Sequence, residues 1–258
     1  MFTEFNKEYT DYEILLRAYQ REKITENVGR FVNYWGNGDT VRALEELWVK
    51  EPEHQKDASF GTNTGFYVGI KEVERYLVSE LDERRHKELE EYQNARPEAG
   101  YGEKDIGLGQ SRQHSAATPL LYIANDGLTA RMLVYDLGFT GKGHPDGKAE
   151  SFFEYGLMFL EFALEDNEFK IWHVVCEHDM TIPTGVNYNE TPTIITDPSD
   201  PSMWEFGDPT VKREVYNNVF GWEYLLEDMP KPYKYYDEDM GYGPKGKVGR
   251  KFYERIYN

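Results

Sequence analysis

The chain has few features that would fix its fold covalently or direct it to a membrane. Cys176 is its only cysteine, which excludes an internal disulfide framework and fits a reducing compartment. No run of about 18 apolar residues occurs, so no transmembrane helix is expected. The start, Met1–Asn6, lacks a basic stretch followed by an apolar one, so no signal peptide is expected. These absences predict a cytoplasmic protein.

Basic residues are also scarce. Lys and Arg number 29 against 47 Asp and Glu, which gives a formal net charge of −18. An acidic protein is repelled by nucleic acid and by anionic membrane surfaces. The sequence therefore predicts neither as a partner.

Several common catalytic signatures are missing as well. The sequence contains no Gly-rich phosphate loop, dinucleotide fingerprint or G-x-S-x-G elbow. The run Cys176–Asp179 holds four possible metal ligands. Neighbours in a strand point to opposite faces, so this run cannot converge on one ion. We expect no metal site, and no nucleophilic role for a cysteine on a packed strand.

What is present begins with helices. Residues 11–35 carry apolar residues at three- and four-residue spacing, which predicts a helix with one buried stripe: Ile24, Val28, Phe31, Val32 and Trp35. A second helix should follow Gly38 and carry residues 41–48. A third should start near Ile70. The charged and then Gly-rich residues 82–113 predict a helical continuation followed by a surface loop.

Four long strands should follow, at Thr118–Asn125, Thr129–Leu137, Ser151–Leu164 and Phe169–Asp179. The loop Gly138–Glu150 between the second and third is a candidate pocket rim. Three helices before a meander of strands predict an α+β fold, in which a curved mixed or antiparallel sheet and the N-terminal helices form a cone-shaped barrel. Pockets sit in the mouths of such cones.

The last part of the chain differs in character. Residues 182–258 are rich in proline and show few periodic apolar patterns, apart from a possible short helix at Glu214–Leu226. We therefore predict a core domain at 1–181, with an insertion at 82–113, and an irregular extension at 182–258. The extension should pack on the core or on a neighbouring subunit because it is rich in aromatics: Trp204, Phe206, Phe220, Trp222, Tyr233, Tyr235 and Tyr236.

Short motifs resemble the SnoaL-like branch of the nuclear-transport-factor-like superfamily. The resemblance covers about residues 15–180 and is specific only in combination. It is carried by residues 34–39 (YWGNGD), residues 65–70 (GFYVGI), His114, residues 125–130 (NDGLTA) and residues 169–173 (FKIWH). The insertion and the tail depart from the common pattern.

This resemblance implies a chemistry. Relatives include scytalone dehydratase, bile acid 7α-dehydratase, polyketide cyclases, steroid isomerases and diaryl lyases. They generally use no metal and no organic cofactor. Their shared step is proton abstraction or elimination beside an activating carbonyl or phenol. Many members are not enzymes, so the fold alone assigns no activity.

His114 and Tyr34 are candidate catalytic residues. His114 stands just before a predicted strand, where the dehydratases place their base, and a histidine exchanges protons near neutral pH. The alternative is an ordinary loop histidine. Tyr34 could hold a substrate carbonyl. Asp39 follows it at about the place of a family aspartate, but an Asp after Gly is more often a helix cap.

Asp136 and His173 complete the predicted catalytic set. Strand alternation places Asp136 on the face of Ala130, Met132 and Val134, which could line the cavity; the alternative is a strand end in solvent. His173 could orient Asp136 or Glu161, although a histidine here is more often a satisfied core residue. The expected substrate-binding residues are mainly apolar or aromatic: Phe60, Tyr67, Met132, Val134, Tyr155, Met158 and Glu161.

The functional hypothesis is a cofactor-independent lyase, a dehydratase or a related C–O or C–C bond-cleaving enzyme. Its substrate would be a hydrophobic, ring-bearing small molecule such as a phenolic, a polyketide or a steroid. The alternatives are an isomerase or cyclase in the same pocket and a non-catalytic binding module. Convex-face aromatics such as Trp172, with the aromatic tail, suggest a homo-oligomer, either a dimer or a trimer.

Overall fold

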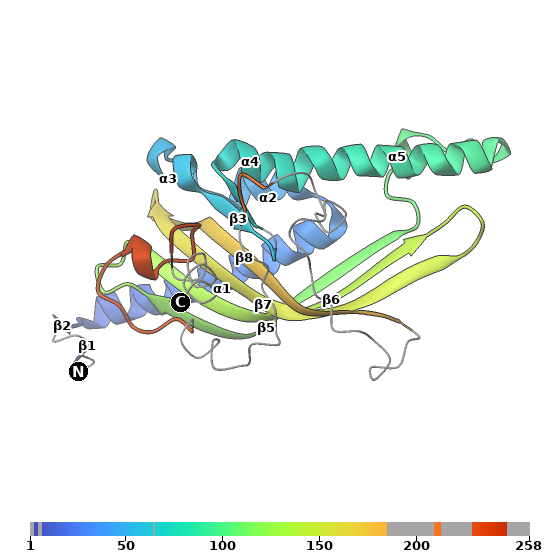
Figure 1. Ribbon diagram of the computed structural model, residues 1–258. Coiled ribbons are helices and arrows are strands. Elements are labelled where there is room, and N and C mark those ends of the chain that lie inside the picture. The colour runs from blue at the N-terminus through green and yellow to red at the C-terminus, as the bar shows by residue number, and fades with distance from the viewer. Residues whose placement is uncertain (1–2, 5–6, 64, 185–208, 213–228, 247–258) are drawn as a thin grey trace, which may run out of the picture.

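The computed structural model describes residues 3–4, 7–63, 65–184, 209–212 and 229–246. They form a curved seven-stranded sheet with helices along one face (Figure 1). The α+β class predicted from the sequence is confirmed. Among the described residues, no helix is both long enough and apolar enough to cross a membrane.

The sheet has the strand order β5-β6-β7-β8-β3-β4-β9. All neighbours pair antiparallel except β3 and β8, which are parallel. A separate two-stranded sheet pairs β1 with β2. The bounds are β1 (Thr3–Glu4), β2 (Lys7–Glu8), β3 (Ser59–Gly61), β4 (Gly65–Val68), β5 (Gln110–Ile123), β6 (Thr129–Gly143), β7 (Ala149–Glu165), β8 (Glu168–Pro183) and β9 (Val211–Lys212).

The helices match the predicted order, with additions. A π-helical turn at Arg75–Ser79 joins α4 to α5, so the predicted third helix continues to Ala95 and projects over the long β6–β7 hairpin (Figure 1). The α-helices are α1 (Asp11–Asn37), α2 (Thr40–Leu47), α3 (Pro52–Asp57), α4 (Ile70–Glu74) and α5 (Glu80–Ala95). Short 3₁₀ turns lie at Pro97–Ala99, Glu103–Asp105 and Glu238–Met240.

Local sequence signals fix both ends of α1. Thr10 and Glu13 form a reciprocal capping box at its start, which satisfies backbone N–H groups that lack an intrahelical partner. Gly38 ends it in the left-handed region at φ 74°, a conformation that costs glycine little. Between these two ends, α1 buries its predicted apolar stripe, from Ile24 to Trp35, in the main core.

Different parts of the chain pack on the two faces of the sheet. On the helical face, Met132, Val134, Met158 and Val174 pack with α1, α2 and the α4–α5 region in the main core. On the other face a smaller cluster joins Leu133, Leu157, Phe159 and Val175 to Tyr242. The second cover comes from the described part of the C-terminal extension, residues 229–246. The predicted tail aromatics Trp204, Phe206, Phe220 and Trp222, and the predicted helix Glu214–Leu226, lie outside the described residues.

Several local expectations are corrected. β5 begins at Gln110 rather than Thr118, so His114 lies inside a strand. The expected loop Gly138–Glu150 is mostly strand, with its turn at residues 144–148. From their polar composition, residues 51–64 are expected to be irregular and residues 65–69 to be a tight connection, but these segments contain α3, β3 and β4. These strands are short and glycine-rich, so strand periodicity could not reveal them.

Trp172 also differs from the prediction, because it is buried rather than exposed on the convex face. It is the extra residue of a bulge in β8: His173 pairs with Glu161, Ile171 pairs with Phe162, and Trp172 is skipped. Its indole N–H donates to the Asp57 carboxylate at 2.9 Å and to the His54 carbonyl at 3.1 Å. A bulge breaks the simple alternation of a strand.

Candidate functional site

Strand register brings His114 and Asp136 together. His114 in β5 pairs with Gly138 in β6, and Asp136 lies two residues from Gly138 along β6. Directly paired residues of an antiparallel sheet point to one face, and residues two apart in a strand do the same. His114 and Asp136 are therefore diagonal neighbours on the helical face.

The same register adds one residue from each of the next two strands. Gly138 pairs with Glu154 in β7, and Asp136 pairs with Gly156. Gly156 in turn pairs with His178 in β8. Four strands thus each contribute one ionisable side chain to the same face. We call His114, Asp136, Glu154 and His178 the four-strand cluster.

Asp136 is the centre of this cluster. Its Oδ1 lies 2.9 Å from Nδ1 of His114, and its Oδ2 lies 3.4 Å from Nε2 of His178. The side chains of His114 and Asp136 are each only 1% exposed. The two imidazole rings lie nearly parallel, with centroids 6.3 Å apart and an interplanar angle of 18°. One carboxylate therefore orients two histidines.

The environment keeps Asp136 ionised. Burial by itself would raise the pKa of this carboxyl. The hydrogen bonds from His114 and His178, together with their positive charge when protonated, outweigh that effect and lower its pKa to about 2. An anionic Asp136 accepts a hydrogen bond from the Nδ1–H group of His114, which leaves the lone pair of Nε2 available.

Packing fixes the ring of His114 on its other side. Trp35, at the end of α1, stacks on the imidazole with a centroid distance of 4.5 Å and an interplanar angle of 9°. Phe60 packs against the edge of Trp35. The predicted apolar stripe of α1 thus also supports the orientation of a polar side chain.

The backbone of His178 is fixed separately. Asn63, just beyond β3, donates its side-chain amide to the His178 carbonyl and accepts from the His178 N–H, both at 2.9 Å. A second bulge in β8 follows at once, since His178 and Met180 pair with Gly156 and Tyr155 while Asp179 is skipped. Bulges often re-aim side chains beside functional sites.

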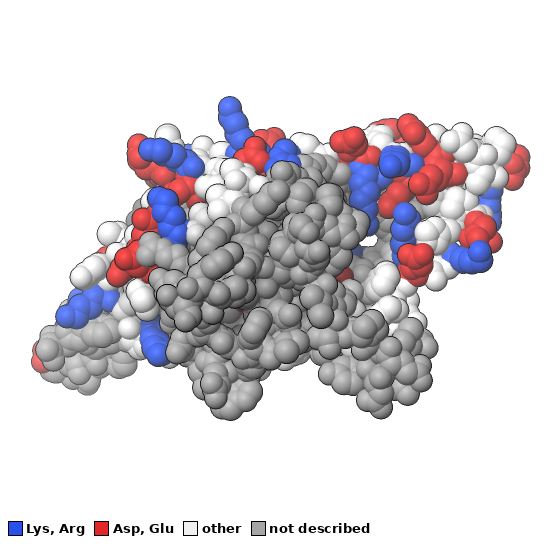
Figure 2. Space-filling model, viewed as in Figure 1, with Lys and Arg blue, Asp and Glu red and all other residues white. Residues whose placement is uncertain are grey.

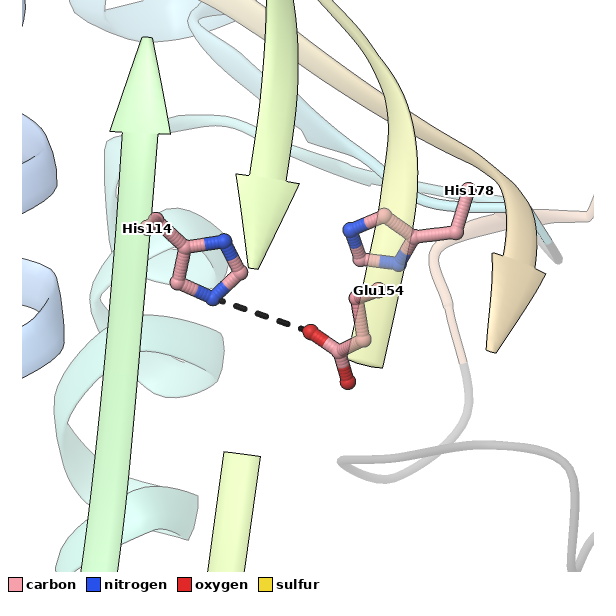
Figure 3. Close-up of side chains that lie close together, drawn as sticks. All are labelled: His114, Glu154 and His178. Carbon is pink, nitrogen blue, oxygen red and sulfur yellow. Dashed lines mark ion pairs between the residues drawn. The ribbon is translucent and has the colours of Figure 1, made fainter. Parts of the chain in front are cut away.

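Two buried atoms of the cluster lack hydrogen-bond partners. Within the described part of the chain, neither Nε2 of His114 nor Oε2 of Glu154 has one. They lie 3.9 Å apart, and the ring of His178 lies beside them (Figure 3). That separation is too long for a hydrogen bond. Buried polar groups are rarely left unpaired, so these atoms are available to a substrate or an ion.

A pocket of about 240 Å³ lies under α5 and borders the four-strand cluster at Glu154, whereas His114, Asp136 and His178 are not part of its wall. Its wall includes Trp35 and Glu154, which flank His114, and also the apolar side chains of Leu81 and Phe152. The remainder consists of glycine and uncharged polar residues together with six charged ones: Arg84, Arg85, Glu88, Arg112, Lys142 and Glu150. Figure 2 shows acidic and basic side chains intermixed on α5 and around the hollow beneath it.

The other predicted catalytic residues lie elsewhere. The Tyr34 hydroxyl donates to Glu46 at 3.0 Å and accepts from Arg30 at 3.1 Å. His173 is five residues from His178 with no bulge between them, so it faces the opposite side of the sheet. There its Nδ1 lies 2.9 Å from the Ser59 hydroxyl. The structure brings neither Tyr34 nor His173 to Asp136.

The predicted substrate-binding residues are also distributed differently. Most are fully buried in the main core, where they pack against one another instead of lining the pocket under α5: Phe60, Tyr67, Met132, Val134 and Met158. Tyr155 stacks on Tyr135 on the opposite face. Glu161 forms a buried ion pair with Arg131, with 2.7 Å between Oε1 and Nε.

Sequence reasoning missed Glu154 and His178. Glu154 lies outside the apolar part of its strand, and His178 was set aside with the run Cys176–Asp179. A usable signal was the glycine next to each in register. A Cβ on Gly138 would lie 3.0 Å from Oε2 of Glu154 and 3.1 Å from Cε1 of His114. Glycine within a strand often marks such a close approach.

No family model matches the chain, and no curated protein matches it. Solved structures similar to it include NTF2-like (nuclear-transport-factor-like) proteins, as the motif resemblance predicted. The hexachlorocyclohexane dehydrochlorinase LinA-type3 of Novosphingobium barchaimii is 13% identical over 67% of this chain and 97% of its own, with a TM-score of 0.46. An NTF2-like protein with a cystatin-like fold from Novosphingobium aromaticivorans is 14% identical over 67% and 90%, with a TM-score of 0.44. These likenesses describe the fold.

Proposed function

We propose that this chain is a cofactor-independent lyase that eliminates water, or a related leaving group, by acid–base chemistry. The observation that carries the proposal is the buried His114–Asp136 pair, with Nδ1 held at 2.9 Å and Nε2 left without a hydrogen-bond partner among the described residues. A histidine oriented by a carboxylate, with its second nitrogen available, is a competent general base. The motif resemblance to dehydratases adds to this.

The proposed step follows from these positions. Nε2 of His114 takes a proton from a carbon beside an activating carbonyl or phenol. The C–H electron pair forms a C=C bond, and the C–O bond breaks with its electrons on oxygen. The oxygen leaves as water after receiving a proton, for which Glu154 is the nearest carboxyl donor to Nε2. Asp136 stabilises the imidazolium formed in the first step.

The pocket wall refines the substrate class. Trp35, Leu81 and Phe152 offer apolar surface to a ring. The Arg85 guanidinium donates to neutral oxygens, those of Gln110 at 3.4 Å and Gly38 at 3.3 Å. Burial and the charge of Arg112 lower the pKa of Arg85, so an anion beside it would be stabilised. We therefore favour a ring compound that also carries a carboxylate, phenolate or other oxyanion.

The test is a substrate screen followed by one substitution. Hydroxylated ring compounds, with and without an acidic group, are incubated with the chain, and products are scored by mass for the loss of water. A positioned general base contributes about 10²–10⁴-fold. His114→Ala should therefore reduce turnover by about that factor and leave the circular dichroism spectrum unchanged.

His86→Ala is the matched control, because this histidine lies exposed on α5 and should be replaceable without loss. Asp136→Asn should lower kcat more than it raises KM, since Asp136 acts through His114. Undiminished turnover in folded His114→Ala would remove the assignment. A product of unchanged mass would indicate an isomerase or cyclase.

We also propose that the protein is a homo-oligomer and that it is cytoplasmic. Leu137, Phe139 and Phe153 lie on the face of β6 and β7 opposite the cluster and are 36–45% exposed. Such a patch supports a homo-oligomer, which sedimentation velocity would measure. Cys176 is buried and forms no disulfide within the described residues, which agrees with the proposed cytoplasmic location.

A further inference from the structure

The four-strand cluster has more ligand atoms than an acid–base pair requires. One ligand atom each from His114, Glu154 and His178 lies within 4.8 Å of the others. Two of these atoms, Nε2 of His114 and Oε2 of Glu154, are buried without hydrogen-bond partners in the described part of the chain. Two imidazoles and one carboxylate form a donor set suited to zinc and its neighbours among the first-row divalent ions.

The second layer of contacts has the form found around metal-binding histidines. Histidines that ligate a metal usually donate their other ring N–H to a carboxylate, which fixes the tautomer and directs the free lone pair at the ion. Here Asp136 performs this role for both rings, at 2.9 Å from His114 Nδ1 and 3.4 Å from His178 Nε2. Nε2 of His114 then faces Glu154 at 3.9 Å, and the ring of His178 lies beside them (Figure 3).

We infer that His114, Glu154 and His178 bind one divalent transition-metal ion of the zinc class, with Asp136 orienting both histidines. Ligand atoms of a tetrahedral zinc ion lie about 3.3 Å apart, given metal–nitrogen distances of about 2.0–2.1 Å. On binding, the 3.9 Å between His114 Nε2 and Glu154 Oε2 would contract by about 0.6 Å, and the widest separation in the group, at most 4.8 Å, by up to about 1.5 Å. Of the three ligands, Glu154 also lines the pocket under α5, from which an ion could reach the site.

Charge and space agree with this assignment. The carboxylates of Glu154 and Asp136 balance a divalent ion bound to neutral imidazoles. Gly138 keeps the gap between His114 and Glu154 free of a side chain, since a Cβ there would lie 3.0–3.1 Å from both residues. The ligands come from three strands of one sheet, and α1 supports His114 through Trp35.

The inference goes beyond the proposed lyase and can be tested without it. Nε2 of His114 cannot hold a metal and accept a proton from a substrate at the same time. Bound Zn²⁺ should therefore inhibit the metal-free elimination competitively with substrate. Metal binding is measured with no substrate present, so failure of one proposal does not decide the other.

The experiment uses the untagged full chain, stripped with a chelator and titrated with Zn²⁺ by calorimetry, and with Co²⁺ by visible absorption. We expect one ion per chain, a Co²⁺ spectrum of low coordination number, and a rise in Tm with added Zn²⁺. Asp136→Asn should weaken binding by about 10–100-fold. Glu154→Gln and His178→Asn should weaken it at least as much.

A double variant of an exposed pair, His86→Asn with Glu103→Gln, is the matched control and should bind Zn²⁺ like the parent chain. NMR of the parent chain provides a readout that no variant can obscure by misfolding, because Zn²⁺ should shift the ring signals of His114 and His178. The inference is overturned if Zn²⁺ shows no saturable binding, if folded Glu154→Gln and His178→Asn bind it undiminished, or if those ring signals do not move.

Discussion

At the scale of single residues, two buried histidines of one sheet have different uses. His114 has a carboxylate on one nitrogen and an unpartnered second nitrogen at the described site. His173 has only the Ser59 hydroxyl at 2.9 Å, and no carboxylate is bonded to it among the described contacts. Burial, and the positive charges of His54 and Arg131, lower the pKa of His173 to about 3. His173 is therefore a neutral structural residue.

This pKa predicts how stability depends on pH. In the unfolded chain His173 binds a proton below about pH 6.5, whereas in the folded chain it stays neutral down to about pH 3. Its contribution is fully present above pH 6.5 and is lost as pH falls toward 3, by at most about 1.4 kcal/mol per pH unit.

His173→Asn keeps a polar partner for Ser59 but does not titrate. Its unfolding free energy, measured by urea denaturation between pH 4 and 8, should fall less steeply on acidification than that of the parent chain. The two curves should run parallel above pH 7, where both side chains are neutral. Equal slopes from pH 6 to 4 would contradict the assignment.

At the scale of elements, the site depends on how four strands are aligned. Side chains alternate along each strand, so a shift of one residue in any strand would remove its member from the cluster. Three bulges interrupt this register, one in β5 between Ala117 and Leu120 and two in β8. The first includes Thr118 at a positive φ of 47°. Gly138 in β6 and Gly156 in β7 leave space beside the side chains of the cluster.

Substitution of Gly138 tests whether this glycine in β6 provides the space that the cluster needs. Gly138→Val should displace Glu154 and His114, because even a Cβ would lie 3.0–3.1 Å from both. Misplacement of a catalytic group by about 1 Å can cost about 10²-fold in rate. We expect kcat to fall by about 10–100-fold while the strand remains folded, measured on the substrate that the screen identifies.

Gly141→Val in the same strand is the matched control. Its Cβ would meet neighbours only at 3.7–3.8 Å, which is ordinary contact, so kcat should persist. Because Gly141 borders the pocket under α5, any change should be confined to KM. If both variants lost activity equally, the effect would be general strain in β6 and not the spacing of the cluster.

At the scale of the whole molecule, residues 229–246 pack on the face of the sheet opposite the α-helices. Arg131 of β6 and Glu161 of β7 connect the sheet to this segment. Glu161 accepts from the Tyr242 N–H at 2.9 Å, and Arg131 donates to the Asp237 carbonyl at 3.0 Å. The Glu161 side chain is fully buried, and Arg131 is 6% exposed. The charge of Glu161 raises the pKa of Arg131 even though burial opposes this.

Removing one member of such a pair leaves the other charge buried and unpaired, at a cost of about 3–5 kcal/mol. Glu161→Gln should lower the unfolding free energy by about that amount and speed proteolysis within residues 229–246. Glu26→Gln, in the exposed Lys23–Glu26 pair, should change little. A loss no larger than in this control would mean that the segment is held by apolar contacts alone.

The sequence by itself predicted most of the elements and two residues of the four-strand cluster. Apolar periodicity located α1 and the cores of four strands. Alternation grouped Asp136 with Met132 and Val134, with a solvent-exposed strand end as the alternative, and His114 was proposed from its place in the family motifs. These features follow from residues close together in the chain.

Only the tertiary structure decided which ionisable groups meet. Glu154 and His178 join His114 through pairing across four strands, and His173 is excluded because it lies an odd number of residues from His178. A strand pattern repeats every two residues and carries no record of bulges or of the register between strands. Whether these side chains meet depends on the bulges and on the register, so it could be determined only from the assembled sheet.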